Sequence, residues 1–295
     1  MTTFLDVRYQ PVGGGLAGQV NLNQTTDAGD YVSLSADEFE SRIRGRNVLI
    51  AAHGYNVSRA DGIESLSNWA SLVASHFAAD EPFAFVGLLW PGDSVWAHGL
   101  DYPDEPKIAD EAGALIGPFV DANFQDAASV SFASHSLGAR VVLATIKNMT
   151  QKVRRLTLMA GAIDDNCLST EFADAAANVE VISALASKKD TVLSHLYPLG
   201  NFVAGIIDEG HPWWRAAIGH HGPAKNHRPS NFRSPFMLPD DWDFNHGNYL
   251  QVDQTPVPAL APPYDVPPQD TPEPASGATG WQEAFTAAFE SDRFR

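Results

Sequence analysis

A serine stands between small residues in the stretch from Ser131 to Val142, SFASHSLGARVV, where an apolar strand pattern runs directly into a helical one. This arrangement is typical of a nucleophile elbow, a tight strand-to-helix turn that exposes a serine hydroxyl for attack on a carbonyl carbon. Strand and helix approach closely at such a turn, so the positions two before and two after the nucleophile must be small. Ser134 and Gly138 occupy these positions around Ser136, and Ser134 departs from the usual glycine.

Attack by Ser136 would need hydrogen-bond donors for the negative charge that develops on the substrate oxygen. The start of a helix supplies free N–H groups and a favourable dipole, so we expect the Leu137 amide to be one donor. The Tyr55 amide is the second candidate, because Gly54 permits a sharp turn after an apolar strand. The alternatives are that Ser136 only caps its helix and that Gly54 marks an ordinary turn.

A carboxylate and a histidine are also required, and after an elbow of this kind they follow the serine in the order acid, then histidine. Asp190 is the favoured acid, because it lies in the loop after the apolar run Val179 to Ala184, at a strand end where such sites form. Asp164 and Asp165, which follow the preceding strand, and Asp208 are the competing acids.

His246 is the favoured base, because it comes late in the chain in a turn rich in Asn and Gly. Four other histidines in an irregular segment are its rivals: His211, His220, His221 and His227. A metal site built on these rivals is disfavoured, because adjacent histidines in a Pro/Gly loop lack the spacing of a ligand set. We therefore expect neither a metal nor a cofactor.

The elements that must position these residues alternate along the chain. Apolar runs predict strands at 47–52, 83–90, 128–133, 155–160 and 179–184, and helical periodicity predicts helices at 58–77, 107–124 and 137–148. Continuous apolar strands separated by helices indicate a parallel sheet that is covered on both faces. The sequence thus predicts an α/β fold with a doubly wound, mostly parallel sheet.

The regular alternation ends near residue 197. We expect one domain over residues 1–250, in which residues 197–245, crowded with Pro, Gly and aromatic residues, form an irregular, lid-like segment. Prolines predict an extended tail over 251–280, because they fit neither a helix nor a central strand. Residues 281–295 resemble a short terminal helix that docks on the body.

Composition limits the partners. The 295 residues include 19 Lys and Arg against 36 Asp and Glu, a formal net charge of −17, which disfavours nucleic acid and anionic substrates. A neutral, apolar small molecule is the expected ligand, and Trp90, Trp213 and Trp214 are candidates to line its pocket, with core or lid packing as the alternative.

No apolar run approaches the roughly 18 residues of a membrane span, and the first residues do not resemble a secretory signal. Cys167 is the single cysteine, which fits a reducing compartment. We therefore expect a soluble, cytoplasmic protein.

Five short segments carry these candidate residues: HGYN at 53–56, WPGD at 90–93, SHSLGA at 134–139, SKKD at 187–190 and NHGNY at 245–249. Together they resemble the esterase- and lipase-like α/β-hydrolases, in particular a bacterial subgroup with HGYN and WP segments. The resemblance spans about residues 45 to 250. It implies an α/β-hydrolase fold with Ser136 as nucleophile, Asp190 as acid, His246 as base, and the Tyr55 and Leu137 amides as oxyanion hole.

The residues and the resemblance predict a serine hydrolase that cleaves a carboxylic ester through an acyl-enzyme. Serine rather than aspartate at the elbow argues against a haloalkane or epoxide hydrolase. Within enzymes, the alternative is amide, thioester or acyl-transfer chemistry on the same three residues. Outside enzymes, the alternative is a non-catalytic binding module with this fold, for which we would expect the serine, acid or base to be missing.

Overall fold

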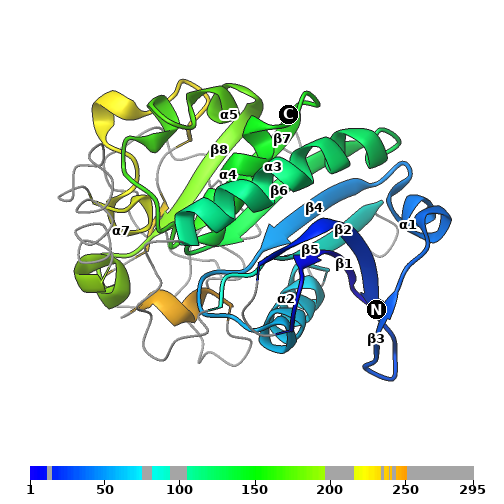
Figure 1. Cartoon of the computed structure of the whole chain (residues 1–295). Coiled ribbons are helices and arrows are strands. Elements are labelled where there is room, and N and C mark those ends of the chain that lie inside the picture. The colour runs from blue at the N-terminus through cyan, green and yellow to red at the C-terminus, as the bar shows by residue number, and fades with distance from the viewer. Residues whose placement is uncertain are drawn as a thin grey trace.

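Nine strands form one sheet in the part of the chain that the structure describes (Figure 1). The structure is a computed structural model and describes residues 1–11, 15–74, 82–93, 105–196, 216–233, 236–238, 240 and 244–250. The strands are β1 (Thr3–Arg8), β2 (Leu16–Thr25), β3 (Tyr31–Ser33), β4 (Asn47–Ala52), β5 (Phe83–Leu89), β6 (Ser129–His135), β7 (Val153–Met159), β8 (Val179–Ala186) and β9 (Phe236–Met237). Their order is β3-β2-β1-β5-β4-β6-β7-β8-β9.

Helices cover both faces of this sheet (Figure 1). They are α1 (Ala36–Ile43), α2 (Arg59–Ala74), α3 (Glu105–Asn123), α4 (Gly138–Lys147), α5 (Ala173–Ala177) and α7 (Ile218–His221). The crossover through α2 moves along the sheet in one direction, whereas those through α3 and α4 move in the other. Because such crossovers are right-handed, α2 lies on one face, and α3 and α4 lie on the other.

Six neighbouring pairs are parallel: β1–β5, β5–β4, β4–β6, β6–β7, β7–β8 and β8–β9. The pairs β1–β2 and β2–β3 are antiparallel. The predicted α/β class with a doubly wound, mostly parallel sheet is therefore confirmed, and each predicted strand and helix overlaps an observed one. The predicted helix at 58–77 runs into residues 75–77, which lie outside the described residues. Among the described helices, none combines the length and apolar character that a membrane span requires.

The first three strands are an addition to the predicted elements. Phe4 and Leu5 of β1 are fully buried, and β1 pairs with β5 inside the sheet. In β2 only alternate residues such as Val20 and Leu22 pack against the core. In a strand with one solvated face, apolar and polar residues alternate, so the strand has no continuous apolar run. A prediction based on continuous apolar runs therefore misses β2.

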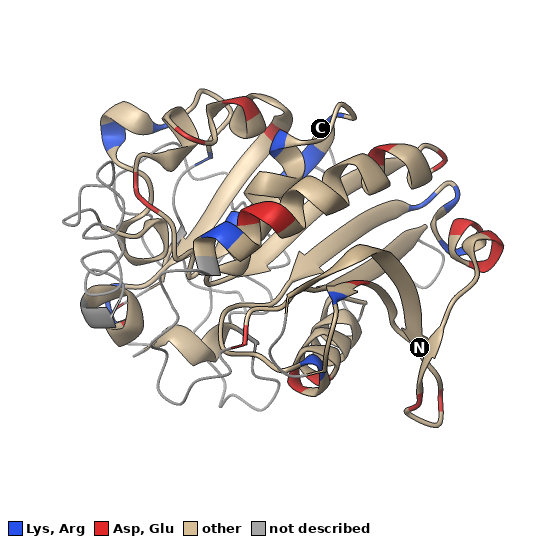
Figure 2. Cartoon of the chain, viewed as in Figure 1, with Lys and Arg blue, Asp and Glu red and all other residues tan. Residues whose placement is uncertain are grey.

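Charged residues lie mostly on helices and loops (Figure 2). Asp6 and Arg8 of β1 are exceptions, because they are charged residues within the sheet and are buried. Burying an ion is costly unless it is paired and hydrogen-bonded. Both side chains have such partners, and these partners lie at the carboxyl end of the sheet.

The first turn of α4 approaches the end of β4 at Gly138. A β-carbon at Gly138 would lie 2.3 Å from the carbonyl oxygen of His53 and 3.0 Å from that of Ala52. Real β-carbons essentially never come this close to a backbone oxygen. Glycine is therefore required here, and the small residue expected two positions after Ser136 has a direct steric reason.

We predict that Gly138→Ala lowers the free energy of unfolding by about 1 to 3 kcal/mol, because the added methyl group must displace the backbone of β4 or α4. Gly161→Ala is the matched control, since its β-carbon would meet no atom closer than 3.6 Å. Urea unfolding of both variants measures the difference. Equal losses in the two variants would contradict the steric explanation.

Candidate active site

Ser136 has a left-handed backbone at the end of β6, with a φ of 53°. This conformation is uncommon for any residue except glycine and is found where function requires a particular side-chain direction. Main-chain hydrogen bonds hold it: the Ser136 N–H donates to the Met159 carbonyl at 3.0 Å, and the Ser136 carbonyl accepts from Ala139 and Ala162, both at 3.1 Å. The strained turn predicted from the sequence is therefore present.

Ser136, His246 and Asp190 form a chain of hydrogen bonds. The Ser136 hydroxyl lies 2.8 Å from His246 Nε2, and His246 Nδ1 lies 2.7 Å from Asp190 Oδ2. Asp190 is fully buried, and its other oxygen accepts a hydrogen bond from the Leu193 N–H at 2.9 Å. With Nδ1–H donating to the carboxylate, Nε2 is the acceptor for the hydroxyl proton.

The loops that carry Asp190 and His246 are bound to each other. The Ser187 hydroxyl donates to the Phe244 carbonyl at 2.6 Å. The side-chain oxygen of Asn245 accepts from the Thr191 N–H at 3.1 Å, from the Thr191 hydroxyl at 3.0 Å and from the His246 N–H at 2.8 Å. These contacts explain why Asp190 and His246 meet although they are far apart in sequence, since residues beside Asp190 bind residues beside His246.

His135, next to the serine, contacts the same histidine loop. Its Nε2–H donates to the His246 carbonyl at 2.8 Å, and the two rings are 4.9 Å apart. Burial, and secondarily a positive charge on His246, lower the pKa of His135 to about 3, so its ring is neutral at pH 7. His135 was not among the predicted site residues, although it directly precedes Ser136 in the segment at 134–139.

The turn after β4 lies against the elbow. A β-carbon at Gly54 would be 2.9 Å from Ser136 Cβ and 3.0 Å from His135 Nδ1, so the Gly54 backbone lies directly beside the serine. Tyr55 follows at once, which puts its amide close to the same place. The next residue, Asn56, has a φ of 58°, and its N–H donates to the Gly92 carbonyl.

Leu137, rather than Ser136, is the cap residue of α4. The Leu137 side chain makes no capping hydrogen bond, whereas at α1 the Ser35 side chain accepts one from the Glu38 N–H. In the first turn of α4 the Ala139 and Arg140 amides donate to the carbonyls of Ser136 and Leu137, at 3.1 and 2.9 Å. The Ser136 hydroxyl contacts His246 instead of capping the helix.

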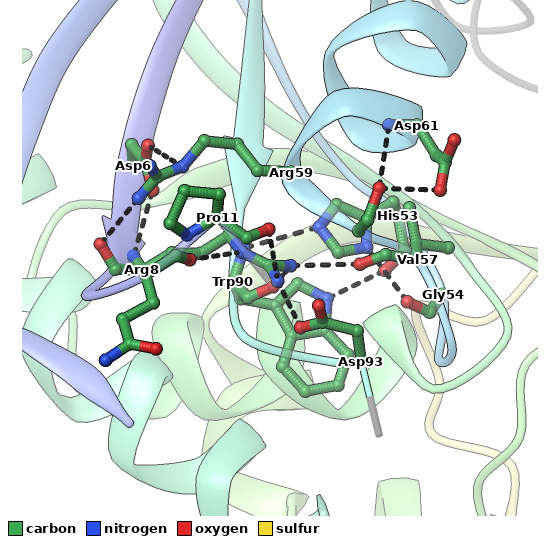
Figure 3. Close-up of polar contacts among 12 residues, drawn as sticks. Asp6, Arg8, Pro11, His53, Gly54, Val57, Arg59, Asp61, Trp90 and Asp93 are labelled. Carbon is green, nitrogen blue, oxygen red and sulfur yellow. Dashed lines mark hydrogen bonds and ion pairs between the residues drawn. The ribbon is translucent and has the colours of Figure 1, made fainter. Parts of the chain in front are cut away.

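Trp90 is fully buried, in contrast to the expectation that its ring lines a substrate pocket. Its indole N–H donates to the His53 carbonyl at 2.9 Å, and its ring stacks on that of His53 at 5.8 Å (Figure 3). Trp90 thus supports the turn after β4 from within the core. Trp213 and Trp214 lie outside the described residues.

Three of the rival residues lie in other contacts. The main chain of Asp164 forms an isolated bridge with Ala217, His220 Nε2 donates to the Lys188 carbonyl at 3.2 Å, and His227 Nδ1 lies 2.7 Å from the Ser169 hydroxyl. Asp208 and His211 lie outside the described residues. In the described ranges, no three His, Cys, Asp or Glu side chains gather in a way that could hold a metal ion.

The buried His53 predicts a pH dependence of stability. Burial, with the nearby Arg8 charge acting in the same direction, lowers the pKa of His53 from 6.5 to about 4. Between these values the unfolded chain takes up a proton that the native state does not, so the free energy of unfolding falls as the pH falls.

We expect His53→Gln to reduce this fall by about 2 to 3 kcal/mol between pH 7 and pH 4.5. Urea unfolding at several pH values measures the two slopes, and groups common to both proteins cancel in the comparison. Identical slopes would contradict the buried, neutral state of His53.

Comparison with known proteins adds the family. Residues 35–200 match the family model described as an alpha/beta hydrolase of unknown function, DUF900. A search of curated proteins found no match. The matched segment contains Ser136 and Asp190, whereas Arg8 and His246 lie outside it.

Among solved structures, the chain is similar to a predicted CIB-like hydrolase from Thermoplasma acidophilum, with 15% identity, a TM-score of 0.41, and coverage of 79% of this chain and 85% of that one. Esterase B from Lactobacillus rhamnosis has 8% identity, a TM-score of 0.39, and coverage of 84% and 79%. Acetyl xylan esterase 1 from a Thermoanaerobacterium species has 13% identity, a TM-score of 0.38, and coverage of 83% and 82%.

At these identities and TM-scores the three solved structures say nothing about the substrate of this chain. The family model matches more than half of the sequence, and the described sheet has the parallel order that the match implies. The chain belongs to the DUF900 family of alpha/beta hydrolases, a family whose function is unknown.

Proposed function

We propose that this protein is a serine hydrolase that cleaves neutral carboxylic esters through an acyl-enzyme. The observation that carries the proposal is the hydrogen-bonded chain from the Ser136 hydroxyl through His246 to the buried Asp190. A hydroxyl next to a base, with that base oriented by an acid, is the arrangement that activates a weak nucleophile. The net charge of −17 favours neutral over anionic substrates.

In acylation, Ser136 Oγ attacks the ester carbonyl carbon while His246 Nε2 takes the hydroxyl proton. The carbonyl oxygen becomes negative and accepts hydrogen bonds from the Tyr55 and Leu137 amides. His246 then gives its proton to the alcohol oxygen as the carbon–oxygen bond breaks. The alcohol leaves, and the acyl group remains on Ser136.

In deacylation, water replaces the alcohol. His246 takes a proton from water as the water oxygen attacks the acyl carbon, and returns the proton to Ser136 Oγ as the carboxylic acid leaves. The His246 side chain is 15% exposed, which leaves it accessible to water. Asp190 keeps the proton of the neutral ring on Nδ1 and stabilises the imidazolium that forms in each step.

Ser136→Ala should lower ester hydrolysis by at least about 10³-fold without lowering the free energy of unfolding, because only the nucleophile is lost. Hydrolysis of p-nitrophenyl butyrate and labelling by a fluorophosphonate probe with peptide mapping measure this. Ser134→Ala is the control, since it removes a buried hydroxyl two residues away that has no hydrogen-bond partner among the described residues. Unchanged turnover in Ser136→Ala would refute the proposed mechanism.

Asp190→Asn should lower kcat by about 10²- to 10⁴-fold, because an amide facing His246 Nδ1 no longer enforces the required tautomer. Asp165→Asn changes the charge equally at a rival position and should retain wild-type kcat. Steady-state kinetics on p-nitrophenyl butyrate compare the two variants, and circular dichroism checks that both are folded. If Asp165→Asn lowered kcat more than Asp190→Asn did, the catalytic acid would belong to the loop of Asp165.

A further inference from the structure

Arg8 is a buried arginine at the carboxyl end of β1. Its side chain has no exposed surface. Because β1 runs parallel to β5, Arg8 lies at the sheet edge at which β4 and β6 end and where Ser136 is placed. The pairing of β1 with β2 shifts register between Asp6 and Arg8, and such irregularities redirect side chains.

The Arg8 guanidinium binds two separate segments at once (Figure 3). Its Nη1 donates to the Val57 carbonyl and to the Trp90 carbonyl, both at 2.9 Å. Its Nη2 pairs with the Asp93 carboxylate and donates to the Pro11 carbonyl at 3.3 Å. Arg8 therefore connects the turn at residues 53–57 with the segment at residues 90–93.

The two segments are also bound directly to each other. The Asn56 N–H donates to the Gly92 carbonyl, and the Trp90 indole donates to the His53 carbonyl at 2.9 Å. Gly54, between these contacts, lies against Ser136. A continuous series of contacts thus leads from the Arg8 guanidinium to the backbone beside the candidate nucleophile.

We infer that Arg8 is a positioning residue for the oxyanion hole: it fixes the turn at residues 53–57 so that the Tyr55 amide points at the substrate oxygen. This inference rests on the proposed function. Arg8 lies before residue 35, where the family match begins, so the N-terminal strand supplies this support.

The chemistry of the side chain favours this role over simple filling of the core. A buried ion pair is seldom more stabilising than apolar residues of the same volume. A planar guanidinium, however, presents several donors in a fixed geometry, and main-chain carbonyls in two loops can be held in one arrangement by a single group. Arg8 uses this geometry on Val57 and Trp90.

The test replaces the pair by neutral amides, Arg8→Gln with Asp93→Asn, so that no buried charge is left unpaired. The matched control is Arg59→Gln with Asp6→Asn. Arg59 Nε lies 3.0 Å from Asp6 Oδ2, and Arg59 Nη2 donates to the Arg8 carbonyl at 2.9 Å (Figure 3). The control thus neutralises an adjacent ion pair that joins the start of α2 to β1 and, through Tyr31, to β3, and that does not bind the carbonyl groups of Val57 and Trp90.

Two measurements are made on each protein: kcat and KM for p-nitrophenyl butyrate, and hydrogen exchange of the amides in residues 53–57. We expect the Arg8 double variant to show a kcat about 10- to 100-fold below wild type, KM within about twofold, and faster exchange in the turn. Misplacing a donor that acts only on the transition state lowers kcat rather than raising KM. The control should keep wild-type kcat and exchange in the turn.

The inference would be overturned if the Arg8 double variant kept wild-type kcat although its turn exchanged faster. It would also be overturned if hydrogen exchange in the turn of that variant stayed at the wild-type rate. An equal kcat loss in the control would overturn it too, because the effect would then be a general cost of losing an ion pair. If the double variant does not fold, Arg8→Lys is measured in its place, since lysine keeps a charge beside Asp93 but lacks the guanidinium geometry. Inactive wild-type protein would count against the proposed function alone, and the exchange comparison would still decide whether Arg8 fixes the turn.

Discussion

The contact between Gly138 and the His53 carbonyl is the constraint on which the arrangement of the site depends. It brings the first turn of α4 against the end of β4, and Ser136 must then take a left-handed backbone to join β6 to α4. The same contact leaves Gly54 directly beside the serine. One steric condition thereby determines both the direction of the hydroxyl and the place of the turn that faces it.

The other loops are held by a common device, in which polar side chains bind main-chain groups of a neighbouring loop. Ser187 binds the Phe244 carbonyl, His135 binds the His246 carbonyl, and Arg8 binds those of Val57 and Trp90. Loops cannot bury their main-chain groups without such partners. The hydrogen bonds that pair these buried main-chain groups also set the relative positions of the loops. The same contacts therefore satisfy the backbone and position the residues of the site.

Much of the fold could be predicted because parallel strands buried on both faces are continuous apolar runs, as at residues 47–52. The first three strands could not: β1 is buried, but Asp6 and Arg8 interrupt its apolar run, and β2 and β3 each have residues exposed to solvent. The prediction also named the residues that meet at the elbow, since an elbow imposes small neighbours on Ser136 and an order on its partners; their catalytic role stays a prediction. Arg8 was missed because most of its partners are main-chain carbonyls, which have no signature in the sequence, and its one carboxylate partner, Asp93, lies 85 positions away. Trp90 was assigned to a pocket because composition does not separate a core indole from an exposed one.

The contacts of the site join parts of the chain that are far apart: Ser136 and His246 are separated by 110 positions, and Arg8 and Asp93 by 85. Closing such long loops has an entropic cost that only an already ordered sheet can offset. The helices form from local contacts, whereas the parallel sheet already needs long-range ones, such as Asn47 with Ser129, 82 positions apart. The proposed chemistry depends in addition on the contact between Ser136 and His246, which closes a longer loop still. During refolding, secondary structure should return before activity does, and in a partly unfolded chain activity should be the first property lost.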